Sequence, residues 1–447
     1  MSATTRIDDV VLVPLDGPPA APLGDVRRGA LRIRDDRIEA LGELQPNPGE
    51  VVVAGRGRHL LPGFVQGHVH CCQTLFRGLA DDLPLLEWLA QRIWPLEHAH
   101  DAASTRASAE LTFCELLRAG TTTVQTMESV RHTEQAFAAA RAFGLTAILG
   151  NCLMDLASDA MPRGMAQSAA DALRTTEELW RAFHGNGRLA VAVAPRFLLS
   201  CSDGLARDAA AFAREAGLRV HTHAAEHPAE VAAVRARFAA DYVEVLHEQG
   251  LLGSHTGLAH CVHTSARERE LLVATGTAVL HCPSTNLKLG SGIAPIADYR
   301  RRGLRIALGA DGAPCNNRLS ALTELRTAAL AAALAAGPGT WPAAQALWTA
   351  TRGGAIALGL QDEVGCLAPG LRADLCLFDL GDPSLSPGGD AASALVYAAD
   401  ERQLTDVVLG GRFVVRGGDL VARDHRAVAA DAAAARAQVL ARAGLAR

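Results

Sequence analysis

Short apolar runs alternate with longer segments rich in Ala, Leu, Arg and Glu from about residue 60 to residue 362. Examples are "TTVQTM" followed by "EQAFAAARAFG", and "LAVAVAPRF" followed by "GLARDAAAFAREAG". Each pair has the pattern of a β-strand followed by a helix, and the pattern recurs seven or eight times. Repetition of this kind favours a closed parallel (β/α)8 barrel over an open sheet.

The two ends of the chain differ from this middle part. Residues 1–58 contain short β-branched runs such as "VVLVPL", separated by Gly, Pro and Asp, and β-type runs such as "LTDVVLGGRFVV" return in residues 363–447. We therefore expect an α/β protein with a catalytic barrel in residues 59–362. Both ends would pair into one small β-sandwich domain, and the last residues would add a terminal helix.

Charge and cysteine content restrict the partners and the compartment. A net charge of -5 without a long Lys/Arg block argues against nucleic acid and favours a small-molecule partner. The ten cysteines form no CxxC pair, which indicates reduced thiols in the cytoplasm. No signal sequence and no apolar run of about 18 uncharged residues is evident, so we expect no membrane partner. We further expect a homo-oligomer.

Polar residues end five of the apolar runs. In a (β/α)8 barrel the carboxyl ends of the strands face the active site, so these residues are candidates for chemistry. The runs are "GFVQGHVH", "LRVHTHAAE", "GLAHCVH", "AVLHCPSTN" and "LRIALGADG", which contribute His68, His70, His221, His223, Glu226, His260, His263, His281 and Asp311.

His68 and His70 lie two positions apart in one expected strand, so their side chains point to the same side. Alone, this pair fits hydrogen-bonded core histidines as well as two neutral rings that share a divalent metal ion. His223 and Asp311 at other strand ends favour the metal. Together the four residues offer three nitrogens and one oxygen around an open position, as in catalytic metal sites.

Five motifs occur in order along the chain: the HxH of residues 68–70, the HxxE of residues 223–226, "AHCVH", "HCPSTNLKLGSGIAP" and "GADGAPCNN". With these motifs the chain resembles the amidohydrolase superfamily, in its branch of purine and aminopyrimidine-like deaminases. The most similar group contains the S-adenosylhomocysteine, methylthioadenosine and 5'-deoxyadenosine deaminases. Guanine deaminase and the s-triazine hydrolases form related groups. The resemblance runs from about residue 55 to 365 and continues into "GCLAPGLRADLCLFDL".

The resemblance implies that His68, His70, His223 and Asp311 bind a single divalent ion, Zn2+ or alternatively Fe2+. No lysine stands where other branches hold a second metal through a carbamylated side chain. His221, two positions before His223, would then have a supporting or packing role.

The resemblance also implies a reaction in which a water activated by the metal displaces ammonia from an amino-bearing ring carbon. Glu226 would protonate the neighbouring ring nitrogen. Asp311 would accept the proton of the water and return it to the leaving amine, and His260 would orient the water. His281 would support these groups or take part directly.

Four further residues are candidates for binding the substrate. Glu97 corresponds to a glutamate that binds ribose hydroxyls in adenosine-type deaminases, although it could be an ordinary surface acid of a helix. Trp88 would form an apolar wall or simply pack, and Gln73 would bind the heterocycle or its own loop. Arg196 departs from the adenosine-type group, which typically has histidine there, and instead resembles guanine deaminase. A guanidinium only donates hydrogen bonds, so it prefers carbonyl oxygens or ring-nitrogen acceptors.

The expected function is therefore an aminohydrolase that acts on a 5'-modified adenosine. The alternatives are deamination of guanine or another oxo-purine or pterin, and an s-triazine amino- or chlorohydrolase. A cyclic-amide hydrolase would commonly use the bridging lysine that is missing. A ligand-binding barrel without activity would be expected to lose Glu226 or Asp311, and both are present.

Overall fold

The computed structural model describes residues 4–445, which form two compact units. The first unit contains the described residues up to Gln66, together with Cys114–Thr123 and Ser320–His425. The second contains Gly67–Phe113, Val124–Leu319 and the described residues from Arg426 onward.

A nine-stranded sheet in the first unit combines strands from both ends of the chain. Its order is β18-β17-β16-β15-β5-β1-β2-β3, with β4 beside β1. β15 pairs antiparallel with β5, which joins the two chain ends as the sequence predicted. The strands are β1 (Thr4–Leu12), β2 (Arg27–Arg34), β3 (Arg37–Gly42), β4 (Val51–Ala54), β5 (His59–Pro62), β15 (Leu375–Phe378), β16 (Leu404–Leu409), β17 (Arg412–Arg416) and β18 (Asp419–Leu420).

Eight parallel strands close into a barrel, in the order β6-β7-β8-β10-β11-β12-β13-β14 and back to β6. The predicted (β/α)8 barrel is thus confirmed. Its strands are continuously buried apolar runs, because a parallel sheet is covered on both faces. They are β6 (Phe64–Val69), β7 (Thr121–Met127), β8 (Thr146–Gly150), β10 (Leu189–Pro195), β11 (Arg219–Ala224), β12 (Thr256–His260), β13 (Ala278–His281) and β14 (Ile306–Leu308), with the short β9 (Cys152–Leu153) beside β10.

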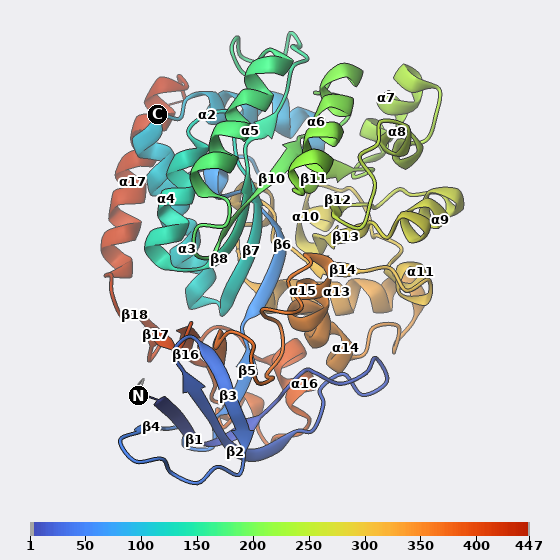
Figure 1. Ribbon diagram of the computed structural model, residues 1–447. Coiled ribbons are helices and arrows are strands. Elements are labelled where there is room, and N and C mark those ends of the chain that lie inside the picture. Colours follow the sequence, from blue (N-terminus) through green and yellow to red (C-terminus); the bar gives the residue numbers. More distant parts are fainter. Residues whose placement is uncertain (1–3, 446–447) are drawn as a thin grey trace. The chain divides into compact units, whose positions relative to one another are not determined.

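Helices connect successive barrel strands, and α4, α5 and α6 lie outside β7, β8 and β10 (Figure 1). Local sequence fixes their ends: Ser202 caps α6 by accepting a hydrogen bond from the Leu205 backbone, and Gly217 ends it at a φ of 65°. The connecting helices are α3 (Ala102–Arg118), α4 (Thr133–Phe143), α5 (Ala169–Phe183), α6 (Asp203–Ala216), α7 (Pro228–Phe238), α8 (Tyr242–Glu248), α9 (Ala266–Thr275), α10 (Pro283–Lys288) and α11 (Ile296–Arg301).

Shorter helical segments fill the loops at the carboxyl ends of β6 and β14. After β6 they are η1 (Cys71–Phe76), α1 (Leu85–Trp88), η2 (Leu89–Ile93) and α2 (Trp94–His98), and after β14 there is α12 (Ala313–Asn316). The first unit adds α13 (Ala321–Ala336), α14 (Ala343–Trp348), η3 (Thr349–Gly353), α15 (Gly354–Ala357), η4 (Pro383–Leu385), α16 (Ala391–Ser393) and η5 (Ala394–Ala398).

The terminal helix α17 (His425–Arg442) belongs almost entirely to the second unit. The sequence prediction had grouped it with the β-sandwich segment. In the structure, Arg436 donates to the Arg77 carbonyl at 2.9 Å and Arg442 donates to the Ala99 carbonyl at 2.6 Å. The helix therefore supports the segment that follows β6.

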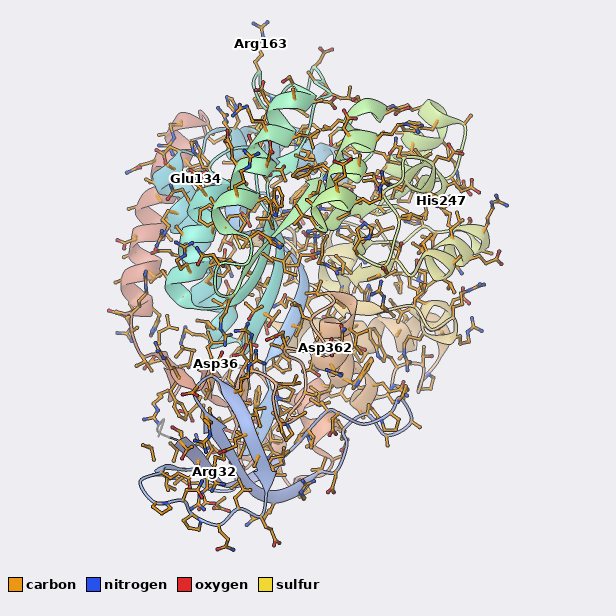
Figure 2. All side chains as sticks on the ribbon, viewed as in Figure 1. Arg32, Asp36, Glu134, Arg163, His247 and Asp362 are labelled. Atoms are coloured by element: carbon orange, nitrogen blue, oxygen red, sulfur yellow. The ribbon has the colours of Figure 1, made fainter. Side chains whose placement is uncertain are left out.

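Glu134, Arg163 and His247 are exposed on the surface of the second unit and are labelled in Figure 2. Within residues 4–445, no helix combines the length and the apolar character needed to cross a membrane.

Candidate active site

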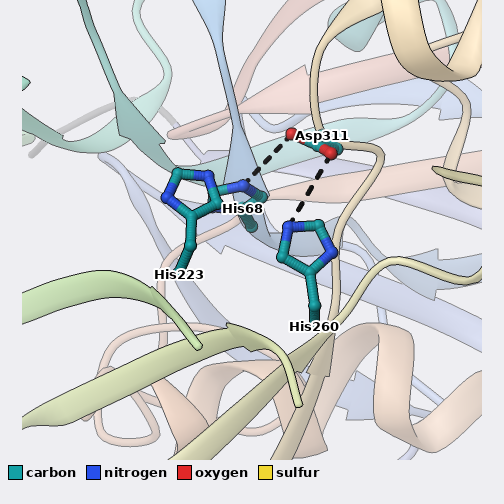
Figure 3. Close-up of side chains that lie close together, drawn as sticks. All are labelled: His68, His223, His260 and Asp311. Carbon is teal, nitrogen blue, oxygen red and sulfur yellow. Dashed lines mark ion pairs between the residues drawn. The ribbon is translucent and has the colours of Figure 1, made fainter. Parts of the chain in front are cut away.

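The strand-end residues that the sequence singled out gather at the carboxyl ends of the barrel strands. β6 contains His68 and is followed by His70, β11 contributes His221 and His223, β12 ends at His260 and β13 ends at His281, while Asp311 follows β14. His68, His223, His260 and Asp311 offer ligand atoms that all lie within 4.8 Å of one another (Figure 3).

Close approach of β14 to β6 fixes Asp311 beside the HxH pair. The Asp311 backbone N–H donates to the His68 carbonyl at 2.9 Å. Gly309 makes this approach possible, since a Cβ there would lie 2.6 Å from the His68 carbonyl oxygen. Asp311 itself has a φ of 60°, a strained conformation for a non-glycine residue that is often found at functional sites.

Each of four imidazoles is held through its Nδ1 atom. His70 Nδ1 donates to the Met127 carbonyl and His223 Nδ1 donates to the Arg196 carbonyl, both at 2.7 Å. The last two contacts are His260 Nδ1 with Asn286 Oδ1 at 2.9 Å, and His68 Nδ1 with His221 Nε2 at 2.7 Å. The Nε2 atoms are thereby left to face the centre, as in metal sites where partner groups fix the ring of each ligand.

The Nε2 atoms lie too close together to be explained by hydrogen bonds among themselves. His70 Nε2 is 3.2 Å from His223 Nε2, although the Nδ1 atom of each ring already holds the proton that it donates to a carbonyl. Two nitrogens bound to one tetrahedral Zn2+ at 2.0–2.1 Å would be separated by about 3.3 Å. The arrangement therefore fits a shared divalent cation.

An aspartate oxygen completes this arrangement. Asp311 Oδ1 lies 3.2 Å from Nε2 of both His68 and His70. His260 Nε2 is farther away, 3.9 Å from Asp311 Oδ2 and 3.5 Å from Glu226 Oε2. Nε2 of His68 and Nε2 of His260 are buried without a hydrogen-bond partner, which also suits a cation or a bound substrate at the centre.

Burial favours the neutral form of the His68 and His223 rings, which is the form that binds a metal. It lowers the pKa of His68 to about 4 against the opposing effect of Asp311, and it lowers the pKa of His223 well below the usual value. Burial would also raise the pKa of Asp311, but its contacts with His68 and His70 outweigh this and hold that pKa well below the ordinary range. Asp311 is therefore a carboxylate.

Glu226 has the opposite character. Burial, and then the nearby charges of Asp311 and Glu230, raise its pKa well above the ordinary value. Its Oε1 atom is buried and has no hydrogen-bond partner. Two carboxyl groups with opposed pKa shifts in one site are what an acid and a base require.

An open cavity of about 390 Å³, with the solvent space at its mouth included, lies beside these groups. Five apolar side chains form part of its wall: Leu85, Trp88, Leu89, Phe197 and Leu289. The polar lining consists of His70, Gln73, Arg196, His223, Glu226, Glu230, His260 and Asp311.

Three of the four predicted substrate-binding residues, Gln73, Trp88 and Arg196, line the cavity, and the fourth, Glu97, is buried in contact with two of them. Arg196 donates to Glu97 Oε2 at 2.7 Å and to Oε1 at 3.2 Å. Gln73 Nε2 donates to Glu97 Oε1 at 2.8 Å. The alternative of an ordinary surface acid is therefore wrong for Glu97.

His281 is buried and does not line the cavity. Burial, and then His260, lower its pKa to about 3, so it is neutral. His263 Nε2 donates to the Ser291 carbonyl at 2.6 Å and is a structural residue of its loop.

Sequence reasoning missed several groups that hold the site together. Asn286 binds His260, Cys315 donates to Asp311 Oδ2 at 3.3 Å, and Tyr242 donates to Glu230 at 2.6 Å. The sequence carried a signal for two of these residues, because Asn286 lies in the same quoted motif as His281, and Cys315 lies in the same quoted motif as Asp311. For Tyr242 the sequence offered none.

Paired imidazoles, a carboxylate and a buried acid meet at the carboxyl ends of the strands of a parallel barrel. This arrangement is typical of metal-dependent hydrolytic enzymes. The chain belongs to the amidohydrolase family, whose sequence model matches residues 59–414.

Two curated relatives match nearly the full chain. The 5-methylthioadenosine/S-adenosylhomocysteine deaminase of Moorella thermoacetica is 34% identical over 92% of this chain and 93% of its own length. The 5'-deoxyadenosine deaminase of Methanothermobacter thermautotrophicus is 34% identical over 90% of this chain and 92% of its own.

Two solved structures are similar over their whole length. An adenosine deaminase from Xanthomonas campestris with bound zinc has a TM-score of 0.90 and 30% identity, covering 98% of this chain and 99% of its own. Guanine deaminase from E. coli has a TM-score of 0.84 and 28% identity, covering 93% and 99%.

Proposed function

We propose that this protein is a hydrolytic deaminase of 5'-modified adenosines such as 5'-deoxyadenosine, methylthioadenosine and S-adenosylhomocysteine. One observation carries the proposal: Asp311 and Glu226, two buried carboxyl groups whose pKa values shift in opposite directions, meet at a cluster of buried imidazoles beside a partly apolar cavity. The names of the most similar relatives support the choice of substrate.

His68, His70, His223 and Asp311 are the ligands that we assign to one divalent ion. The shorter separations favour His70 over His260 as the third nitrogen ligand. Imidazole and carboxylate suit zinc, and the zinc in a structural neighbour supports that choice over Fe2+. When bound, the ion supplies a Lewis acid that makes water nucleophilic at neutral pH.

Asp311 accepts the proton that the attacking water loses, because it is ionised and lies beside the proposed ligands. His260, with Nε2 within 4 Å of carboxylate oxygens of both Glu226 and Asp311, orients the water between the base and the acid.

Glu226 donates its proton to the ring nitrogen next to the attacked carbon, so that the ring can accept the electron pair. A C–O bond forms, the C–N bond breaks, and the amine leaves as ammonia with the proton returned by Asp311. The remaining hydroxyl proton passes to Glu226 as the ring carbonyl forms, which restores the acid. We assign His281 a supporting role, since it lies outside the cavity.

The apolar side of the cavity suits a purine ring and an apolar 5' substituent. Trp88 and Phe197 offer flat faces, and Leu85, Leu89 and Leu289 complete that side. Aromatic and aliphatic walls with a few polar groups are typical of sites for flat heterocycles.

A second candidate is deamination of guanine or another oxo-purine, and the contacts of Arg196 favour it. Both carboxylate oxygens of Glu97 already accept hydrogen bonds from Arg196 or Gln73, so Glu97 is not free for ribose hydroxyls. Gln73 Oε1 is buried without a partner, and its amide is oriented by Glu97. Arg196 as donor and Gln73 Oε1 as acceptor would suit the adjacent C=O and N–H of a lactam.

Ammonia release by zinc-loaded protein distinguishes these candidates. The substrates are adenosine, 5'-deoxyadenosine, methylthioadenosine, S-adenosylhomocysteine, guanine, a pterin and an s-triazine. We expect the highest kcat/KM on a 5'-modified adenosine. A preference for guanine that is lost selectively in Arg196→Ala would establish the second candidate. No ammonia from any of them, and no chloride from a chloro-s-triazine, would indicate a ligand-binding barrel.

The quaternary structure and location expected from the sequence remain part of this proposal. We propose a homo-oligomer in the cytoplasm. Light scattering of the purified protein tests the first point, and fractionation of cells tests the second.

A further inference from the structure

Glu230 is a buried carboxyl group of the cavity wall whose two oxygens are both engaged. Its Oε2 atom accepts the backbone N–H of Glu226 at 2.9 Å and that of His227 at 3.4 Å. Its Oε1 atom accepts the hydroxyl of Tyr242 at 2.6 Å. Glu230 thus binds the main chain of the proposed catalytic acid rather than its side chain.

Tyr242, at the start of α8, connects Glu230 to two further strand ends. Its hydroxyl accepts the Leu198 N–H at 3.3 Å, beyond β10, and lies 3.4 Å from the His223 carbonyl of β11. The residue is 1% exposed. A tyrosine hydroxyl buried among polar groups is fixed by them, so it restricts the position of Glu230.

The main chain before Glu226 requires such support. Ala225 has a φ of 49°, in the left-handed region that residues with a Cβ seldom adopt. Its carbonyl accepts the N–H groups of Val262 and His263, each at 2.9 Å. A strained turn persists only where surrounding contacts hold it in place. Here Glu230 provides such a contact by accepting the Glu226 N–H.

We propose that Glu230 and Tyr242 are positioning residues for the deamination, holding the Glu226 backbone so that its carboxyl faces His260 and the cavity. This inference rests on the proposed function, because it takes Glu226 as the proton donor. Glu230 is also the third residue of α7, and its bonds to His227 form part of an ordinary helix cap. The bond to Glu226 and the pairing with Tyr242 go beyond that capping role.

Glu230→Ala removes both contacts, and Glu230→Gln retains much of the geometry. A glutamine can keep its carbonyl oxygen on the Glu226 N–H and turn its amino group toward the Tyr242 hydroxyl, which then accepts. Tyr242→Phe leaves Glu230 in place but removes its partner. Because misplacement by about 1 Å can cost up to about 100-fold, we expect kcat of Glu230→Ala to fall about 10- to 100-fold.

The variants are compared with wild type in the zinc-loaded full chain, measuring kcat, KM, zinc content and thermal unfolding. We expect a loss confined to kcat in Glu230→Ala, with KM and zinc content close to wild type. Glu230→Gln should recover most of the loss, and Tyr242→Phe should fall between. Asp374→Ala is the control: this buried carboxylate of the first unit accepts the Gly410 N–H at 2.8 Å, so it should lose stability but not kcat.

Wild-type kcat in Glu230→Ala, or a Glu230→Gln as slow as Glu230→Ala, would overturn the inference. If Glu230→Ala fails to fold, wild-type kcat in Tyr242→Phe would overturn it as well. A wild type that releases no ammonia from any purine would instead refute the proposed function, and the inference with it.

Discussion

Glu226 is a carboxyl group whose pKa is raised by burial and by the nearby charges of Asp311 and Glu230. Replacing it with glutamine retains its size but removes the transferable proton, so we expect Glu226→Gln to lower kcat at least ~100-fold, the lower end of general acid catalysis. Metal content should stay at the wild-type value, because Glu226 is not a proposed ligand. Turnover near the wild-type rate would refute its role as proton donor.

The buried pair of Glu97 and Arg196 gives a prediction about stability. Each residue is 4% exposed, so removing one side chain leaves the other buried without a counter-charge. We expect Glu97→Gln and Arg196→Met each to lower the free energy of unfolding by about 3–5 kcal/mol, and the double variant to lose less than the sum. Strict additivity in denaturant unfolding would contradict the coupling.

The same pair predicts that the free energy of unfolding depends on pH. Burial would raise the pKa of Glu97, but Arg196 outweighs it and lowers that pKa in the folded state. The stability that this ionisation contributes is complete above the unfolded value of about 4.3 and is lost as the pH falls through the folded value. The advantage of wild type over Glu97→Gln should therefore shrink in acid and stay constant from pH 6 to 8.

Among individual residues, the sequence revealed those that end apolar runs, because a polar group at such a position is unusual. His68, His70 and Asp311 were found in this way. Glu230 and Tyr242 were not, because a glutamate in the first turn of a helix is common and a core tyrosine has no local signature. The engagement of Glu97 by Arg196 joins positions 99 residues apart, which only tertiary structure reveals.

Lys288, at the end of α10, is the single lysine of the chain and joins three loops around the cavity. Its ammonium donates to a carboxylate oxygen of Asp81, to Asn317 Oδ1 at 2.8 Å and to the Pro314 carbonyl at 3.0 Å. Three acceptors match the three donors of an ammonium. The loop of Asp81 leads directly into the apolar wall of the cavity at Leu85.

We expect Lys288→Met to loosen that wall and raise KM about fivefold, equivalent to about 1 kcal/mol, with a smaller change in kcat. Steady-state kinetics on the best substrate measures both. Arg174→Met, which removes exposed ion pairs on α5, is the control and should leave KM unchanged. An unchanged KM in Lys288→Met would show that the wall does not depend on this contact.

Among the elements, the strands and helices of the barrel were predictable because buried parallel strands and amphipathic helices have distinct periodicities. The attachment of α17 was not. Its Ala/Arg composition predicts a helix but no strongly apolar face, so the partner is chosen by contacts such as those of Arg436 and Arg442.

For the molecule as a whole, the alternation of strand and helix indicated the barrel, and the β-type runs at both ends indicated the sheet that joins them. The sequence did not reveal how residues of both units interleave along the chain, since the segment Cys114–Thr123 and the boundary at Ser320 follow no change in composition. Packing of whole elements decides such boundaries.

The metal content of the purified protein tests the central claim most directly, because all of the assigned chemistry depends on a cation among the histidines. We predict one equivalent of transition metal per chain, lost in His68→Ala/His70→Ala but retained in the surface variant His247→Ala. Protein without transition metal after growth and purification with zinc, or one equivalent that persists in the double variant, would contradict the account.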